Sequence, residues 1–310
     1  MIGTTLEQKR TININKTQVK NLVDEILLEY KQFPVNFLNE NNPEGEFEYL
    51  TILKDYYIRT IFDIVEYTSK LPSKSIKVLE IGAFLGIVSI ALSKLGYEVV
   101  STDIPEFISN ENLQEKLQKN NIKFFDANLV HYSLPCLNEE FDIVIMCEVL
   151  EHLNFNPLPL IKEINRIIKV NGLFYVSLPN IASLKNRMLL LRGKSIHYPI
   201  NYFVTQLNPR NPMIVGIHWR EYTMYEINEM LEMLGFRIEK QYFFDWMDDF
   251  SFFNRKGFIS RLKFIFKKIL YHFLPDLKEN QTNIAVKVTN CQQMLLFNQA
   301  EVLDGASVSQ

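Results

Sequence analysis

The chain has 310 residues, a formal net charge of -3 and 47% hydrophobic residues. This size and apolar content can bury one substantial α/β core together with additional elements. The near-neutral charge provides no basic face for nucleic-acid phosphates, so no nucleic-acid partner is expected. Three scattered cysteines without C-x-x-C spacing indicate reduced thiols rather than a disulfide framework or a zinc site. No leader pattern or membrane-spanning apolar run is found, and a cytoplasmic protein is expected.

The chain begins with two amphipathic patterns, 17–31 and 47–70, separated by Pro34, Pro43 and Gly45. These predict helices that form a lid or a dimerisation arm, with a homodimer as one option. Beyond them strands and helices alternate, which is typical of a parallel sheet. Strands are predicted at 76–82, 97–103, 122–126, 141–147, 172–178, 236–244 and 283–289. The helices between them are predicted at 86–95, 107–120, 156–169 and 223–234.

The first predicted strand ends in a glycine turn, Gly82-Ala83-Phe84-Leu85-Gly86, and Asp103 ends the next strand. Glycines let backbone amides approach a ligand, a helix start offers unpaired N–H groups, and an acid accepts ribose hydroxyl protons. A dinucleotide site would need glycine where Phe84 and Ile87 stand, and no P-loop Gly-Lys-Ser/Thr follows. The pattern therefore predicts an adenosine-containing ligand without phosphates.

These residues resemble the class I S-adenosylmethionine-dependent methyltransferases over roughly residues 75–245. The resemblance includes Glu80-x-Gly82-x-x-x-Gly86, Asp103, the pair Asp126-Ala127, and the strand 141–148 followed by Val149-Leu150-Glu151-His152-Leu153. It implies an α/β, Rossmann-like, doubly wound sheet of about seven strands with the last strand antiparallel. N-terminal helices (1–72) and a helical cap insertion are expected to complete a methyltransferase domain at 73–290. A disordered tail is predicted for 291–310.

The resemblance also implies a site for the cofactor S-adenosyl-L-methionine. Glu80 is expected to bind its amino group, Asp103 its two ribose hydroxyls and Asp126 its adenine amino group. Cys147 and Glu148 are expected near the sulfonium, although Cys147 is equally compatible with the core. The predicted cofactor-binding residues are Glu80, Gly82, Ala83, Phe84, Gly86, Asp103, Ile104, Asp126, Ala127, Cys147 and Glu148. The family usually has a glycine where Phe84 stands.

Methyl transfer to a hydroxyl requires in-line geometry and a base near neutral pKa. His152 follows the fourth predicted strand and is the first candidate, with a turn-capping role as the alternative. His218, which Glu221 can orient, is the second candidate.

A metal-assisted mechanism is an alternative. Glu148, Glu151, His152 and His218 resemble the two glutamates and two histidines with which small-RNA 2'-O-methyltransferases hold magnesium. Histidine is a less usual magnesium ligand, and the chain lacks a basic RNA surface. The prediction is therefore a site without metal.

Two insertions fall outside the minimal core. Residues 180–222 leave the carboxyl end of the fifth strand, where they are placed to contact the acceptor or to form a plain surface excursion. The predicted substrate-binding residues there are Asn180, His197, Tyr198, Arg220 and Tyr222. The second insertion, 247–282, contains a basic amphipathic pattern at 258–273. It predicts a helix that packs on its own domain or makes peripheral membrane contact.

Pro179-Asn180 and the segment 218–223 look like segments of methyltransferases from bacterial polysaccharide and sugar-modification pathways. The sequence thus predicts methyl transfer to a hydroxyl of a small or sugar-like acceptor, with a histidine as general base. Three alternatives remain open: a lipid-soluble, quinone-like acceptor; a metal-assisted 2'-O-methyltransferase; and a non-catalytic cofactor-binding partner protein.

Overall fold

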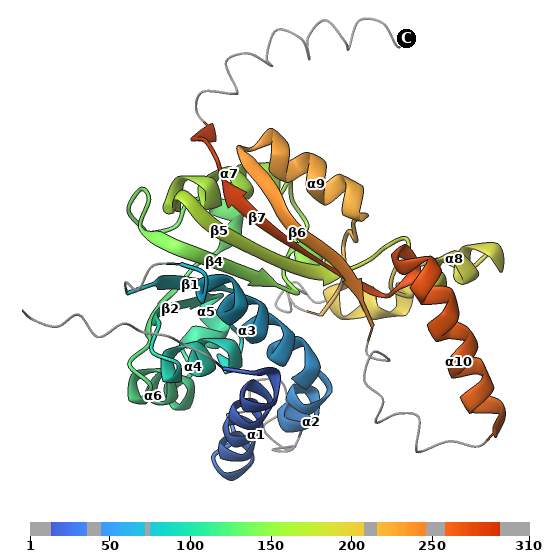
Figure 1. The fold of residues 1–310 in the computed structure, drawn as a ribbon, viewed down its shortest axis with the longest axis horizontal. Coiled ribbons are helices and arrows are strands. Elements are labelled where there is room, and N and C mark those ends of the chain that lie inside the picture. Colours follow the sequence, from blue (N-terminus) through green and yellow to red (C-terminus); the bar gives the residue numbers. More distant parts are fainter. Residues whose placement is uncertain (1–13, 36–44, 72–74, 208–215, 246–257, 292–310) are drawn as a thin grey trace, which may run out of the picture. The chain divides into compact units, whose positions relative to one another are not determined.

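A computed structural model describes residues 14–35, 45–71, 75–207, 216–245 and 258–291 (Figure 1). The chain divides after Asn128 into two compact units. Each unit combines β-strands with helices. None of the helices in this part of the chain is both long and apolar enough to cross a bilayer.

The first unit contains three parallel strands in the order β3-β2-β1. Val78, Leu79 and Ile81 of β1 are fully buried, as expected for a parallel strand covered on both faces. The strands are β1 (Lys77–Ile81), β2 (Glu98–Asp103) and β3 (Lys123–Asp126). The helices are α1 (Lys16–Gln32), α2 (Gly45–Ile52), α3 (Lys54–Thr68), α4 (Ile87–Lys94), α5 (Pro105–Ile108) and α6 (Glu111–Lys119), and a 3-10 turn, η1 (Leu129–His131), follows in the second unit.

The N-terminal helix α1 is anchored to the segment that follows β1. The Asn15 side chain caps α1 by accepting a hydrogen bond from the Gln18 backbone N–H, and the Gln18 side chain accepts one from the Asn15 backbone N–H. At the other end of α1, the buried Tyr30 hydroxyl donates to the carbonyl of Leu85. The helix therefore helps to fix the glycine turn.

The second unit contains four strands in the order β4-β5-β7-β6, and β7 runs antiparallel to both of its neighbours. Helix α9 packs on β6 and β7, whereas α10 extends away from the strands (Figure 1). The strands are β4 (Phe141–Cys147), β5 (Ile168–Pro179), β6 (Phe236–Phe244) and β7 (Asn280–Lys287). The helices are α7 (Leu158–Ile167), α8 (Leu184–Leu191), α9 (Met224–Met233) and α10 (Phe258–Phe273), with 3-10 segments η2 (Leu150–His152), η3 (Ile200–Leu207) and η6 (Pro275–Leu277).

The predicted fold class is confirmed: the described residues form seven strands of an α/β, Rossmann-like fold, and the last strand is antiparallel. The helix predicted at 258–273 is also present. The domain boundaries at 72/73 and 290/291 stay predictions. Of the predicted tail, residues 292–310 lie outside the described residues.

Several predicted boundaries were wrong. The helix predicted at 47–70 is two helices that meet at Leu53, and the helix predicted at 107–120 is also two. The second break occurs because the Asn110 side chain accepts from the Leu113 backbone and starts a new helix there. Strand β5 begins at Ile168 rather than at 172, because Ile168 already pairs with Phe141.

Candidate active site

The glycine turn after β1 is closed by hydrogen bonds within the first unit. Gly82 N–H and Ala83 N–H both donate to the carbonyl of Thr102, at 2.9 and 3.2 Å. Gly86 has φ 70 and caps α4, and a Cβ there would lie 3.0 Å from a Leu117 methyl group. Both the left-handed backbone and the close neighbour explain why glycine occupies position 86.

Phe84 occupies the position where the family usually has glycine. Its φ is 46, within the left-handed region that favours glycine. The ring makes edge contacts with Tyr49 of α2 and Phe107 of α5, with centroid separations of 5.9 and 5.1 Å. These aromatic contacts help to offset the backbone cost of a non-glycine residue here.

Asp103 ends β2 with its carboxylate directed at backbone amides. Phe84 N–H donates to Oδ2 and Ile104 N–H donates to Oδ1, each at 2.7 Å. Burial raises the pKa of Asp103 to about 6, although these two hydrogen bonds act in the opposite direction. Asp126 of β3 lies directly beside Asp103 in the strand register, and Ala127 N–H donates to the Asp103 carbonyl at 2.9 Å. The predicted acids after the second and third strands are therefore brought together.

Glu80 lies within β1 and is 7% exposed. Its carboxylate accepts from the Ser89 hydroxyl of α4, and Ser101 donates to Ser89 at 2.6 Å. Burial raises the pKa of Glu80 to about 7. The two serines were missed at the sequence level, and only the spacing of Ser89 on the helix after the glycine turn could have indicated them.

A second group of chemically active side chains follows β4 in the second unit. Cys147 ends the strand, and the next residue, Glu148, has φ 54. The Ser177 hydroxyl donates to the Glu148 carboxylate, while Glu148 Oε1 is buried and has no hydrogen-bond partner within the described part of the chain. Glu151 is fully buried, and neither of its carboxylate oxygens has a hydrogen-bond partner on another residue in the described part of the chain. Buried polar atoms without partners are rare in native proteins and call for an explanation.

The electrostatics of these two acids follow from their burial. Desolvation raises the pKa of both carboxyl groups, since the charged form loses its water. The nearby charge of Glu221 raises the pKa of Glu148 further, and the charge of Glu148 does the same to Glu151. A cation at this point would stabilise the charged carboxylates and so offset both shifts.

His152 and His218 lie beside Glu151 with their Nδ1 atoms already bonded. His152 Nδ1 lies 2.9 Å from the Ile217 carbonyl, which can only accept, so this nitrogen carries the proton. His218 Nδ1 lies 2.9 Å from Glu221 Oε1. The rings are 4.9 Å apart, and His152 Nε2 is 3.8 Å from Glu151 Oε1. Each histidine is thus oriented by a hydrogen bond at Nδ1, as metal-ligating imidazoles usually are, and its Nε2 is available to a ligand.

The peptide chain brings this cluster together over a long sequence separation. Trp219 N–H donates to the Glu151 carbonyl at 2.7 Å, which places His218 beside η2. One potential ligand atom from each of Glu151, His152 and His218 lies within 4.8 Å of the others, as a metal ion would require. Asn186 of α8 donates to Glu221 Oε2 at 3.1 Å and so orients the acid behind His218. Glu221 was expected to orient His218, and Glu151 was considered as a ligand in the metal-assisted alternative, whereas Asn186 was missed at the sequence level.

The residues predicted to contact the acceptor divide into two sets. Tyr198 packs its ring edge against His218, with 5.6 Å between centroids, and therefore belongs to the cluster. Asn180 is 1% exposed and uses its side chain on the backbone of Asp276, Lys278 and Ala182. These hydrogen bonds indicate a structural role for Asn180.

The other three predicted acceptor residues have local contacts. Arg220 pairs with Glu226 at 2.9 Å and lies over the ring of the buried Tyr222. His197 is exposed, and its backbone N–H donates to Ser195 Oγ. An acceptor contact for any of the three stays a prediction.

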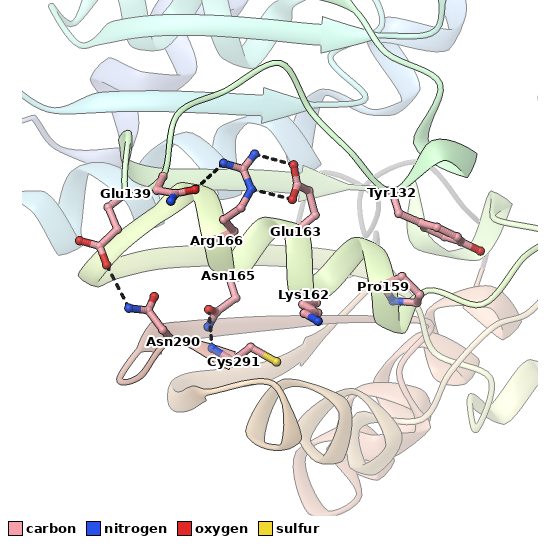
Figure 2. A pocket seen from close by; sticks show the side chains of 10 residues that line it. Tyr132, Glu139, Pro159, Lys162, Glu163, Asn165, Arg166, Asn290 and Cys291 are labelled. Carbon is pink, nitrogen blue, oxygen red and sulfur yellow. Dashed lines mark hydrogen bonds and ion pairs between the residues drawn. The ribbon is translucent and has the colours of Figure 1, made fainter. Parts of the chain in front are cut away.

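Figure 2 shows a pocket of about 360 Å³ beside α7 that no predicted site residue lines in the described part of the chain. Several of its polar side chains are paired: Arg166 donates to Glu163 and Asn138, and Asn165 accepts from Cys291 N–H. These bonds connect α7 to the loop before β4 and to the segment after β7.

A family model described as "Methyltransferase domain" matches residues 53–241, more than half of the chain. The chain belongs to this methyltransferase family. It therefore contains a domain of the S-adenosyl-L-methionine-dependent methyltransferase type, as the motifs around the glycine turn indicated.

The curated relatives that match share about half of their length with this chain. The ubiquinone biosynthesis O-methyltransferase, mitochondrial, of Dictyostelium discoideum is 25% identical over 169 residues, 47% of this chain and 52% of that protein. The ubiquinone biosynthesis O-methyltransferase of Pelagibacter ubique is 29% identical over 145 residues, 46% and 54% of the two chains. These names do not support the predicted polysaccharide pathway.

Solved methyltransferase structures are similar at a lower level. Magnesium protoporphyrin IX methyltransferase of Synechocystis PCC 6803, with bound SAH, has a TM-score of 0.47 and 16% identity, and the alignment covers 88% of this chain and 100% of that chain. The Haloferax volcanii putative methyltransferase in complex with the activator Trm112 has a TM-score of 0.48 and 15% identity over 76% and 92% of the chains. At these values the similarities assign no substrate or partner to this chain.

Proposed function

We propose that this methyltransferase transfers the methyl group to a hydroxyl of a phenolic, quinone-precursor-like acceptor, and that a divalent cation at the Glu-His cluster activates that hydroxyl. One observation carries the proposal. Glu151 is fully buried with no hydrogen-bond partner for either carboxylate oxygen among the described residues, and it faces two histidines whose Nδ1 atoms are already bonded.

On the cofactor side, the proposal uses residues of the first unit. The Asp103 carboxylate has acceptor capacity left after its two backbone hydrogen bonds, and it binds the two ribose hydroxyls. Glu80 binds the cofactor amino group, directly or through water, and Asp126 contacts the adenine amino group. Gly82, Ala83, Phe84 and Gly86 present the backbone.

The donor set of the cluster fits a divalent cation. Glu151 would supply a carboxylate oxygen, and His152 and His218 would supply imidazole nitrogens, a combination that suits Mn²⁺ or Zn²⁺ at least as well as Mg²⁺. Such an ion would act as a Lewis acid that lowers the pKa of a bound hydroxyl. The unbonded carboxylate oxygens support this fit over the metal-free site expected from the sequence.

The chain's own residues prepare this site for neutral pH. Burial and the neighbouring His218 lower the pKa of His152, although its hydrogen bond to Ile217 acts in the opposite direction, so its Nε2 keeps a free lone pair. Glu221 holds His218 in the tautomer with a free Nε2. The same lone pairs would serve as a general base in a metal-free mechanism, which is the competing hypothesis.

The acceptor class has two independent supports. The curated relatives are named as ubiquinone biosynthesis O-methyltransferases, which favours the quinone-like alternative over the sugar-like acceptor. In addition, Tyr198 and Tyr202 continue the row of rings from His218, with 5.3 Å between the tyrosine centroids. A planar aromatic acceptor suits such neighbours. A catechol also offers a cation two adjacent oxygens.

The test combines an acceptor panel with metal removal. The purified protein is stripped with a chelator and assayed with S-adenosyl-L-methionine on short-chain prenylated catechols and on nucleotide sugars, with Mg²⁺, Mn²⁺ or Zn²⁺ restored. We expect methylation of the catechol only, and only with a cation. Transfer to the sugars alone would overturn the acceptor class.

Two variants separate the metal from a histidine base. Glu151→Gln is expected to lose cation-dependent activity, whereas Glu229→Gln, an exposed control on α9, is expected to keep it. Full activity in the stripped enzyme would contradict the cation and favour the histidine.

A further inference from the structure

Helix α10 exposes four apolar side chains and directs one lysine toward its own unit. It packs on the second unit through Phe264 and Tyr271, which are 4% and 6% exposed. Lys267 lies on this packed side and reaches Asp245 at 3.2 Å and Glu279 at 3.6 Å. A helix of a water-exposed surface normally has the opposite arrangement, with charges outward and apolar residues inward.

The outward side is a continuous apolar stripe of four side chains. Phe266 is 69% exposed, Phe273 is 74%, Ile269 is 54% and Ile265 is 44%. Positions 265, 266, 269 and 273 fall on one face at 3.6 residues per turn. Helix α10 extends away from the strands (Figure 1), and all four side chains are exposed.

The charge of the segment identifies the kind of surface that this stripe fits. Residues 255–274 contain six Lys or Arg and no acidic residue, in a chain whose formal net charge is -3. Two of the basic or ionisable residues, Lys268 and His272, follow the stripe along one border by helical spacing. An apolar stripe bordered by basic residues is the pattern of a helix that lies in the interface of an anionic bilayer.

We propose that α10 docks this enzyme onto an anionic lipid bilayer, with Phe266, Ile269 and Phe273 inserted among the acyl chains near the headgroups. The biological purpose of such docking rests on the proposed function, since a lipid-soluble acceptor lies in the bilayer. Its evidence is separate, because the stripe and its charges do not involve the Glu-His cluster.

The obvious competing occupant is a second copy of the chain. Two such helices would bring like charges together, since each carries only basic charges. An anionic headgroup layer instead pairs with those charges, and its acyl chains take up the phenyl rings. The charge pattern therefore favours the bilayer.

The experiment is sedimentation of the full chain with vesicles of phosphatidylcholine alone or with added phosphatidylglycerol. No cofactor, metal or acceptor is present, so failure of the proposed function does not affect the result. We expect binding to the anionic vesicles, weaker binding to the neutral ones, and loss of the difference in high salt. Absence of binding to both kinds of vesicle would overturn the proposal.

Substitutions on α10 test whether this helix makes the contact with the vesicle. Phe266→Asp with Phe273→Asp is expected to reduce vesicle binding at least tenfold, because burial of even one phenyl ring contributes a factor of that size. Leu137→Asp, 76% exposed in the loop before β4, is the matched control and is expected to bind like the wild type. Wild-type vesicle binding by the double variant would overturn the proposal. So would a wild-type dimer, measured by light scattering, that the double variant dissociates.

Discussion

Replacement of Asp103 by alanine tests the cofactor site most directly. The Asp103 carboxylate accepts from Phe84 N–H and Ile104 N–H at 2.7 Å, and it is proposed to bind both ribose hydroxyls. The Asp103→Ala substitution removes four hydrogen bonds, two within the protein and two to the ligand.

The size of the effect follows from the charge of the acceptor. A hydrogen bond to a charged group contributes about 1.5–3 kcal/mol, so the two ribose contacts together contribute about 3 kcal/mol or more. Since about 1.4 kcal/mol corresponds to a factor of ten, the Kd for S-adenosyl-L-methionine is expected to rise roughly a hundredfold. Asp103→Asn keeps one acceptor and loses the charge, and we expect an intermediate Kd.

Isothermal titration calorimetry measures the three Kd values, and circular dichroism verifies that each variant is folded. Glu106→Gln is the control, because this exposed acid is three residues along the chain and makes a long-range contribution to the Asp103 pKa. Its Kd is expected to stay near the wild-type value. A folded Asp103→Ala protein with wild-type affinity would refute the ribose assignment.

Three further predictions concern other parts of the two units. Because the pKa of Glu80 is raised to about 7, the affinity for the cofactor, measured by calorimetry, is expected to fall below pH 7. The free protein is expected to lose stability against urea as the pH rises from about 4.3 to 7, since the folded state binds the proton more tightly than the unfolded state. An affinity that does not change with pH would exclude a charged role for Glu80. Glu221→Ala is expected to weaken cation binding about 10–100-fold through His218, with partial rescue by glutamine, and unchanged binding would remove Glu221 from the site. Tyr30→Phe leaves the Leu85 carbonyl without its donor and is expected to cost about 1–3 kcal/mol in urea unfolding; a smaller loss would mean that water replaces the hydroxyl.

The cofactor loop could be predicted from the sequence because its signal is local. A buried strand, a glycine turn and an acid at the end of the next strand stand within 26 residues, from Val78 to Asp103. Parallel pairing then brings Asp103 beside the glycine turn without further information. What the pattern did not reveal is that Phe84 takes a left-handed backbone and packs between rings of α2 and α5.

Strand β7 shows the opposite case. Its first four residues, Asn280, Gln281, Thr282 and Asn283, have the composition of a loop, and the strand was predicted to begin at the last of them. In the structure all four are buried, and Gln281 donates to the Tyr222 carbonyl at 2.6 Å. Distant partners satisfy the side-chain N–H groups of Gln281 and Asn283, and sequence periodicity contains no information about those partners.

The Glu-His cluster was predicted only in part for the same reason. His152 and His218 were predicted as separate base candidates and were grouped with Glu148 and Glu151 only through a family resemblance. The geometry that brings them together depends on the hydrogen bond from Trp219 N–H to the Glu151 carbonyl. The importance of Glu151 itself is visible only once its side chain is known to be buried without a hydrogen-bond partner in the described residues.

The two candidate sites share one electrostatic principle. Glu80 in the first unit and Glu151 in the second are both buried, and burial raises the pKa of each because the ionised form has lost its water. Such a group costs stability in the free protein and gains it back when a positive charge binds. The methyl donor carries an ammonium group, and the proposed cation carries two charges. Buried acids with raised pKa values at both places are therefore suited to a protein that binds these two positively charged ligands.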